Sequence, residues 1–160
     1  MNFRVLEIGR TVVEELREVD DAGRAVESHV ETTGGPPLRC CLRRAEPGER
    51  VALVSCAPLR RWAVEHGVTP GADDEVGPVF VHAEDCGGPD GPGWPEPLRG
   101  SRRVLRAYSA EGRIVGGCLL DGKTGKSERT ASDLFLDPAV ALVHVRAVEF
   151  GCFLFELRRR

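Results

Sequence analysis

The sequence predicts an α+β fold dominated by antiparallel β-sheet, with seven to nine strands and two or three short helices. Most apolar segments alternate with a period of two residues, as strands with one buried face do. Turn residues, mainly glycine and proline, separate many of these segments, which favours hairpins. Helical spacing is confined to a few short segments.

The N-terminal residues predict a strand followed by a helix. Residues 3–8 alternate in the manner of an opening strand. Thr11 then stands three residues before Glu14, which is the spacing of a capping box. The apolar positions that follow at helical intervals are Val12, Leu16 and Val19. We therefore expect a helix that begins at Thr11 and ends before Gly23.

The next part of the chain predicts a short polar strand and then a hairpin. The polar strand is expected over residues 27–33. Residues 38–43 alternate with period two, and residues 51–56 form an apolar run. The Pro-Gly pair at 47–48 suits a tight turn between them, because proline presets one torsion and glycine accepts positive φ. These two segments are therefore predicted to pair.

A helix, a strand and a long loop are expected next. Pro58 suits the first turn of a helix that ends at Gly67. Residues 76–83 are rich in β-branched and aromatic side chains and predict a strand. Residues 85–100 contain so much glycine and proline that a loop is expected, with Trp94 docked on the protein within it.

The C-terminal half contains the clearest predicted hairpin. Residues 103–108 alternate, a turn follows, and residues 113–120 return with Gly116-Gly117, a signal of a bulge or a close backbone approach. A polar loop over 121–129 and one helical turn over 130–136 are expected after it. Two further strands complete the prediction, over residues 140–147 and 152–157.

Length, charge and hydropathy limit the class of protein. A chain of 160 residues is predicted to form one domain, residues 1–160, with the loop at 85–100 as its long excursion. A net charge of −3 gives no overall attraction to phosphates, so nucleic acid is not an expected partner. No apolar run approaches the roughly 18 residues that span a bilayer, and the first residues do not look like a secretory signal. We expect a cytoplasmic protein that does not bind membranes.

The six cysteines are expected to be reduced thiols in that compartment. Their spacing contains no CxxC pair, and only His82 and Cys86 bring two metal-ligand types close together in sequence. Sequence spacing therefore predicts no metal and no cofactor.

Several strings, in order along the chain, resemble a bacterial family catalogued as domain-of-unknown-function family 1203, from about residue 34 to the C-terminus. They are Pro37-Leu38-Arg39-Cys40-Cys41-Leu42 before Pro47-Gly48-Glu49, Gly77-Pro78-Val79-Phe80-Val81-His82, Arg106-Ala107-Tyr108, and His144-Val145-Arg146 with Gly151-Cys152-Phe153. The chain departs from the Pro-Cys-Arg string of many relatives at Leu38, so a role of that cysteine would have to pass to Cys40 or Cys41. The resemblance implies no activity.

Four polar side chains on two predicted strands form the candidate ligand site. Alternation places Arg106 and Tyr108 on one face of their strand, and His144 and Arg146 on one face of theirs. If the faces converge beneath the 85–100 loop, the two guanidiniums suit a small anion such as a carboxylate or phosphate. The alternative is an outer sheet face on which these side chains are only solvated.

The function predicted from the sequence is therefore the binding of a small anionic molecule by an uncharacterised domain, rather than catalysis. Two alternatives stay open. One is an enzyme that uses Cys152 as nucleophile with His144 or His82 as base. The other is a protein-interaction or assembly module, including a homo-oligomer, that acts through an exposed sheet edge.

Overall fold

The computed structural model describes residues 1–123 and 125–160, and within them it contains two antiparallel sheets and three α-helices. The strands are β1 (Phe3–Leu6), β2 (Ser28–Val30), β3 (Arg50–Cys56), β4 (Gly77–His82), β5 (Arg103–Tyr108), β6 (Ile114–Leu120), β7 (Leu142–Ala147) and β8 (Phe153–Arg159). The α-helices are α1 (Arg10–Glu18), α2 (Pro58–His66) and α3 (Ser127–Leu134). The predicted α+β class, with mainly antiparallel sheet, is confirmed.

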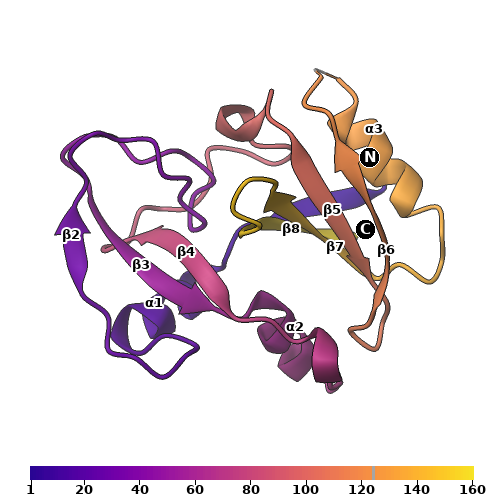
Figure 1. Cartoon of the computed structure of the whole chain (residues 1–160), viewed down its shortest axis with the longest axis horizontal. Helices are drawn as coiled ribbons and strands as arrows, with labels where there is room; N and C mark the ends of the chain where they lie inside the picture. The colour runs from indigo at the N-terminus through magenta and orange to yellow at the C-terminus, as the bar shows by residue number, and fades with distance from the viewer. Residues whose placement is uncertain (124) are drawn as a thin grey trace.

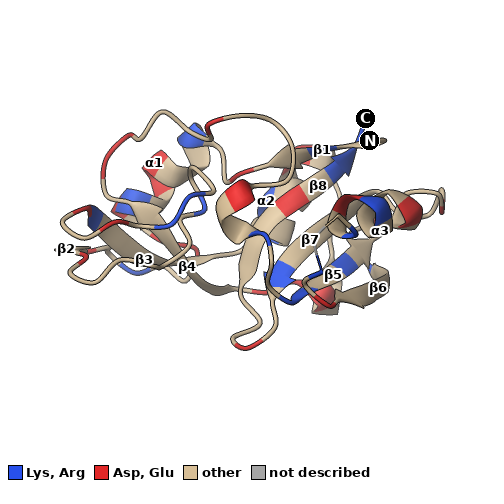
Figure 2. Cartoon of the chain, turned by 90° about the horizontal axis from the view of Figure 1, so that it is seen from above, with Lys and Arg blue, Asp and Glu red and all other residues tan. Residues whose placement is uncertain are grey.

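The strands divide into a five-stranded sheet and a three-stranded sheet. The larger has the order β1-β8-β7-β5-β6, and the smaller has the order β2-β3-β4. Figure 1 shows the small sheet with α1 on one side of the molecule, the large sheet with α3 on the other, and α2 at the junction. The two termini lie side by side because β1 pairs with β8, and basic and acidic residues are interspersed along the ribbon (Figure 2).

The large sheet buries a different set of side chains on each face. One face contributes Leu105 and Phe155 to an apolar cluster that also contains Phe135, just after α3. The opposite face contributes Tyr108, which packs with Trp62 of α2. A separate cluster joins α1 to the small sheet. The second face of the large sheet therefore lies at the junction of the two sheets, beside α2.

The ends of helix α2 were predicted correctly from the sequence, whereas the start of helix α1 was not. Helix α2 begins at Pro58 and ends at Gly67 in the left-handed conformation, as predicted. Helix α1 instead begins at Arg10, with Gly9 as its N-cap and no capping hydrogen bond from a side chain, so the expected cap at Thr11 is wrong. Val19 is exposed beyond the end of α1, because the helix buries Val13 and Leu16 instead.

The predicted strand over residues 38–43 is wrong. This segment folds into tight turns, in which the Leu42 N–H donates to the Leu38 carbonyl (2.9 Å). Leu42 has a φ of 58°, the left-handed region that residues other than glycine seldom adopt. Strand β3 pairs with β2 and β4 instead. The alternation misled because both sides of the segment are buried, including Cys40 and Cys41.

The Pro/Gly-rich loop over residues 85–100 has only one short 3₁₀ turn, at Glu96–Leu98. Its tryptophan is docked as expected: Trp94 is buried and packs edge-to-face on Phe155, with 5.1 Å between ring centroids. The loop therefore covers the Leu105 face of the large sheet.

The hairpin of β5 and β6 forms as predicted, and its glycines serve a close approach. A Cβ atom added to Gly117 would lie 2.5 Å from the Leu105 carbonyl oxygen on the neighbouring strand. The β5–β6 register also shifts between Ala107 and Tyr108. The two features that the glycine pair predicts, a bulge and a close backbone approach, are therefore both present.

Gly117→Ala is expected to lower the free energy of unfolding by about 1–3 kcal/mol, because the added methyl group forces β5 and β6 apart. Chemical denaturation followed by circular dichroism measures this change. Gly116→Ala is the matched control, since its Cβ would meet nothing within 4 Å. Equal effects of the two substitutions would contradict the explanation.

Helix α3 is longer than the single turn predicted over residues 130–136, because it begins at Ser127 and takes in part of the predicted loop 121–129. Residue 124 of that loop lies outside the described residues. None of the described helices has the length and apolar character needed to cross a membrane.

Candidate functional site

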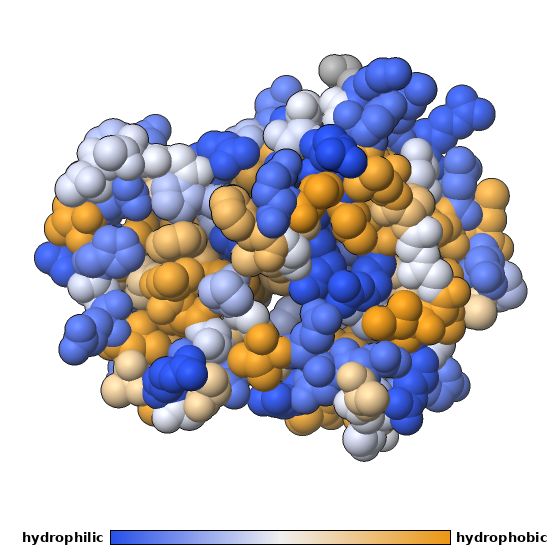
Figure 3. All heavy atoms as spheres, viewed as in Figure 1, coloured by the Kyte–Doolittle hydropathy of each residue, from blue (hydrophilic) through white to orange (hydrophobic). Residues whose placement is uncertain are grey.

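A cavity of about 290 Å³ lies where the large sheet faces the start of β4. Its lining residues come from five parts of the chain: the β3–α2 junction, residues 75–78, β5, β7 and the β7–β8 turn with the start of β8. Figure 3 shows the surface hollowed between the two sheets, with hydrophilic side chains gathered beside the hollow. The cavity contains three of the four predicted ligand-binding residues, Tyr108, His144 and Arg146.

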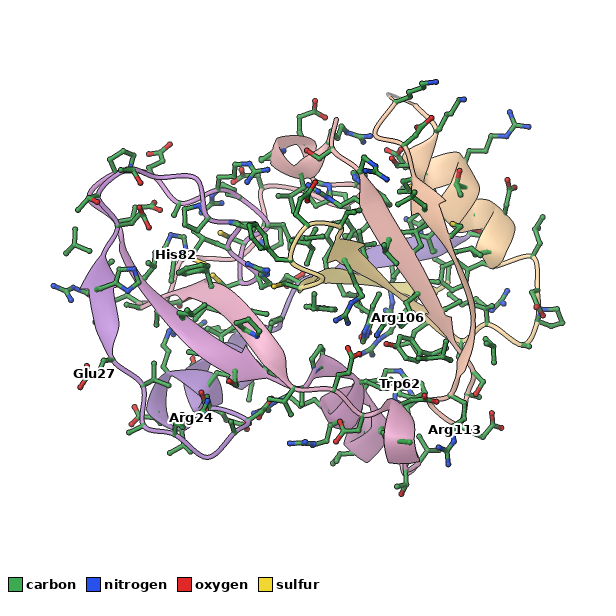
Figure 4. The ribbon with its side chains drawn as sticks, viewed as in Figure 1. Arg24, Glu27, Trp62, His82, Arg106 and Arg113 are labelled. Atoms are coloured by element: carbon green, nitrogen blue, oxygen red, sulfur yellow. The ribbon has the colours of Figure 1, made fainter. Side chains whose placement is uncertain are left out.

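All four predicted residues lie on one face of the large sheet. Arg106 of β5 is directly opposite His144 of β7 in the antiparallel register, so their side chains project to the same side. Tyr108 and Arg146 share this face because each is two residues away from one of that pair. Figure 4 shows Arg106 projecting from β5 in the region between the two sheets. The two strand faces therefore converge.

Sequence reasoning missed Glu75, which joins the two arginines. One of its carboxylate oxygens accepts from Arg106 Nη1 at 2.9 Å, and the other is 2.9 Å from Arg146 Nη2. Burial alone would raise the pKa of Glu75, but the two guanidiniums more than offset it, so this pKa lies below its usual value. Glu75 is 31 positions before Arg106 in the sequence and still farther from Arg146, and no local pattern marks it.

Tyr108 and His144 form the inner wall of the cavity. Burial raises the pKa of the Tyr108 phenol, which outweighs the opposing effect of the neighbouring Arg106. Tyr108 is therefore a neutral hydrogen-bonding group at physiological pH. The His144 ring packs against the Tyr108 ring, with 4.8 Å between centroids, and its Nε2 is 3.1 Å from Glu156 Oε2. Glu156 thus fixes the orientation of the imidazole.

Cys152 lines the same cavity, whereas the other residue of the predicted thiol site does not. The Cys152 thiol donates to the Phe150 carbonyl at 3.6 Å. His82 is at the end of β4, where its Nδ1 faces Cys40 and Cys41. Of the two histidines considered as a base for Cys152, only His144 shares its cavity.

The 85–100 loop does not cover this cavity, contrary to expectation. The described residues that line the cavity include none from the loop, whose Trp94 is buried on the opposite face of the large sheet. Residues 75–78 and the turn at 150–152 border the cavity instead. Glycine and proline content predicts that this segment is a loop. It does not predict on which face of the large sheet the Trp94 ring is buried.

Arg39 is a second residue that sequence reasoning did not single out. Its guanidinium is buried and donates to the carbonyls of Phe153 (2.8 Å) and Pro37. Burial lowers the pKa of Arg39 to about 10, against the opposing effect of nearby cysteines. In the described part of the chain it forms no ion pair with a carboxylate. Because Phe153 lines the cavity, this positive charge lies close behind its wall.

A second cluster of reactive side chains surrounds His82. Sequence spacing predicts no set of metal ligands, whereas the structure brings Cys40, Cys41, His82 and Cys86 together. The hydrogen bond between the two neighbouring thiols lowers the pKa of Cys41 to about 6 and raises that of Cys40. Figure 4 shows sulfur atoms beside the labelled His82.

The sequence profile of a family described as "Protein of unknown function (DUF1203)" matches residues 35–159, which include both clusters. No curated protein and no solved structure shows a match to this chain.

Proposed function

The chain belongs to the DUF1203 family, whose description assigns no function. From the cavity described above, we propose that this protein binds a small carboxylate. The observation that carries this proposal is the Glu75 carboxylate held between Arg106 and Arg146, with both contacts at 2.9 Å. Two guanidiniums spaced to hold one carboxylate suit a ligand that presents the same group.

Glu75 is suited to give way to a ligand. Its side chain is 49% exposed, and ion pairs with an exposed partner contribute only about 0–1 kcal/mol to stability. A carboxylate ligand that enters the cavity would take its place on Arg146 at small cost. The buried charge of Arg39 behind the wall adds to the attraction for an anion.

The lining limits the rest of the ligand. A volume of about 290 Å³ is just below the usual range for small-molecule sites, which is about 300–1,000 Å³. Tyr108 and His144 offer polar contacts, while Leu59 and Phe153 offer apolar ones. The proposed ligand is therefore a small acid with a short, partly apolar body.

Isothermal titration calorimetry with acetate, succinate and benzoate tests the proposal. At least one should bind saturably, and Arg146→Gln should weaken that binding about tenfold to a hundredfold, because a charged hydrogen bond contributes about 1.5–3 kcal/mol. Glu75→Gln should strengthen it by removing the competing carboxylate. Glu111→Gln, an exposed position in the β5–β6 turn, is the control and should bind as the wild type does.

The proposal fails if none of the three acids binds the wild type or Glu75→Gln, or if Arg146→Gln binds as tightly as the wild type. Inorganic phosphate separates the two anion classes expected from the sequence. If phosphate binds saturably and none of the three acids does, the ligand class is a tetrahedral anion and the carboxylate proposal is wrong.

A thiol enzyme is the second candidate, because Cys152 and His144 line one cavity. In that case the thiolate would attack an acyl carbon and release its leaving group, and water would then hydrolyse the thioester. Hydrolysis of p-nitrophenyl acetate by the wild type but not by Cys152→Ala would favour the enzyme. Carboxylate binding that survives in Cys152→Ala, without hydrolysis in either protein, would favour the binding function.

Assembly through a sheet edge is the remaining alternative. Strand β6 is at the edge of the large sheet and exposes Ile114, Val115 and Leu119. Sedimentation of the wild type at micromolar concentration separates a monomer from an oligomer. We also propose a cytoplasmic location, a reducing compartment in which thiols such as those of Cys118 and Cys152 persist.

A further inference from the structure

Three segments of the chain bring four metal-ligand side chains to one place. Cys40 and Cys41 come from the tight turns over residues 38–42, His82 ends β4, and Cys86 begins the Pro/Gly-rich loop. The sulfur and nitrogen atoms that they offer all lie within 4.8 Å of one another. We propose that these four residues form a structural zinc site that ties the loop to the small sheet.

The separations agree with tetrahedral coordination. His82 Nδ1 is 3.5 Å from Cys40 Sγ and 3.7 Å from Cys41 Sγ. Zinc bonds of about 2.3 Å to sulfur and about 2.0 Å to nitrogen place neighbouring ligands about 3.5–3.8 Å apart in a tetrahedron. The two distances from His82 therefore match those of a tetrahedral zinc site, and the Cys86 sulfur lies within 4.8 Å of the other three ligand atoms.

The surroundings of His82 orient it as a ligand. Its Nε2 is 3.2 Å from Glu49 Oε2, which leaves Nδ1 directed at the two sulfurs. A carboxylate behind a metal-bound histidine is a common arrangement, because it fixes the tautomer and makes the ligating nitrogen more basic. The backbone N–H of His82 also donates to Cys40 Sγ at 3.2 Å, which stabilises charge on that sulfur.

The ligand types select the ion and its role. Three sulfurs and one imidazole nitrogen suit zinc, whereas calcium and magnesium prefer oxygen ligands. Four protein ligands fill a tetrahedral zinc ion, which is typical of structural sites, while catalytic sites keep one position for water or substrate. The Arg43 guanidinium lies near Cys41 and Cys86 and offsets the negative charge of three thiolates.

A structural role fits the position of the cluster. The turns over 38–42 and the start of the 85–100 loop contain no regular helix or strand, so few ladder hydrogen bonds hold them. A metal that bridges them would cross-link residues that are more than forty positions apart in sequence. This inference does not depend on the carboxylate cavity, which has a separate lining.

Elemental analysis of untagged protein purified from zinc-supplemented cells tests the proposal. About one zinc per chain is expected in the wild type, and Cys86→Ser and Cys41→Ser should each lose most of it. Cys118→Ser is the matched control and should keep the metal, because Cys118 lies on β6 outside the cluster. Glu49→Gln should bind zinc about 10–100-fold more weakly, as expected for loss of a carboxylate behind a ligating histidine.

Cobalt substitution and metal removal keep the proposal testable if a cysteine variant fails to fold. Wild-type protein reconstituted with Co²⁺ should show thiolate charge-transfer absorption and the visible bands of tetrahedral cobalt. Removal of zinc with a chelator should lower the melting temperature, and added zinc should restore it. Wild-type protein without zinc, full zinc in Cys86→Ser, or a disulfide among Cys40, Cys41 and Cys86 in the freshly purified protein would overturn the proposal.

Discussion

Glu156→Ala is expected to lower the free energy of unfolding by about 3–5 kcal/mol, because it removes a buried carboxylate that pairs with Arg158 and holds the His144 ring. The His144 side chain is 1% exposed and that of Glu156 is 8% exposed, so water cannot replace the lost contact. Arg158 also loses its buried partner. Urea denaturation followed by circular dichroism measures the change.

Glu65→Ala is the matched control, since Glu65 contacts the same Arg158 but its side chain is 60% exposed. Its effect should be within about 1 kcal/mol of zero, as for other surface ion pairs. If the two variants lose similar amounts of unfolding free energy, burial does not explain how much the His144–Glu156 pair contributes to stability.

The His144–Glu156 pair also predicts how the stability of the folded protein changes with pH. Burial would raise the pKa of Glu156, but His144 and Arg158 more than offset it, so the folded pKa is below the ordinary value of 4.5. A carboxyl with a lowered folded pKa contributes stability above its unfolded pKa and loses that contribution as pH falls through the folded pKa. Below about pH 4.5, wild type should therefore lose stability more steeply than Glu156→Gln.

Trp94→Ala should also lower the free energy of unfolding by about 3–5 kcal/mol, because it leaves a cavity in the largest apolar cluster. Trp94 is buried against Phe155, although the loop that carries it has little regular structure. Chemical denaturation of the variant, followed by far-ultraviolet circular dichroism, measures the loss.

Phe150→Ala is the control for Trp94, since Phe150 is also an aromatic residue in a turn but is 86% exposed. It should change stability by about 0.5 kcal/mol or less. A loss below about 1 kcal/mol in Trp94→Ala would mean that the loop is not docked on the large sheet. The loop would then again be a candidate cover for the carboxylate cavity.

Elements with strong local signals could be predicted well. Helix α2 is bounded by Pro58 and Gly67, whose backbone preferences suit the two ends of a helix, and it forms between them. The β5–β6 hairpin follows from alternation and its glycine-containing turn. Residues 38–43 also alternate, but burial on both sides and the left-handed Leu42 turn this segment back on itself. Period alone does not distinguish these outcomes, because it records one buried face and not the neighbours that bury it.

Residue spacing alone specifies which side chains share a face of each strand. Successive Cβ atoms of a strand point to opposite sides, so residues two positions apart share a face. This spacing relates Arg106 to Tyr108 and His144 to Arg146. The packing of the chain sets the register of β5 and β7 that places Arg106 opposite His144, and it brings Glu75 to the two arginines. The same packing brings Cys40 and Cys41 together with His82 and Cys86. Contacts between distant segments depend on how the sheets bury their apolar surface, and local spacing carries no record of that packing.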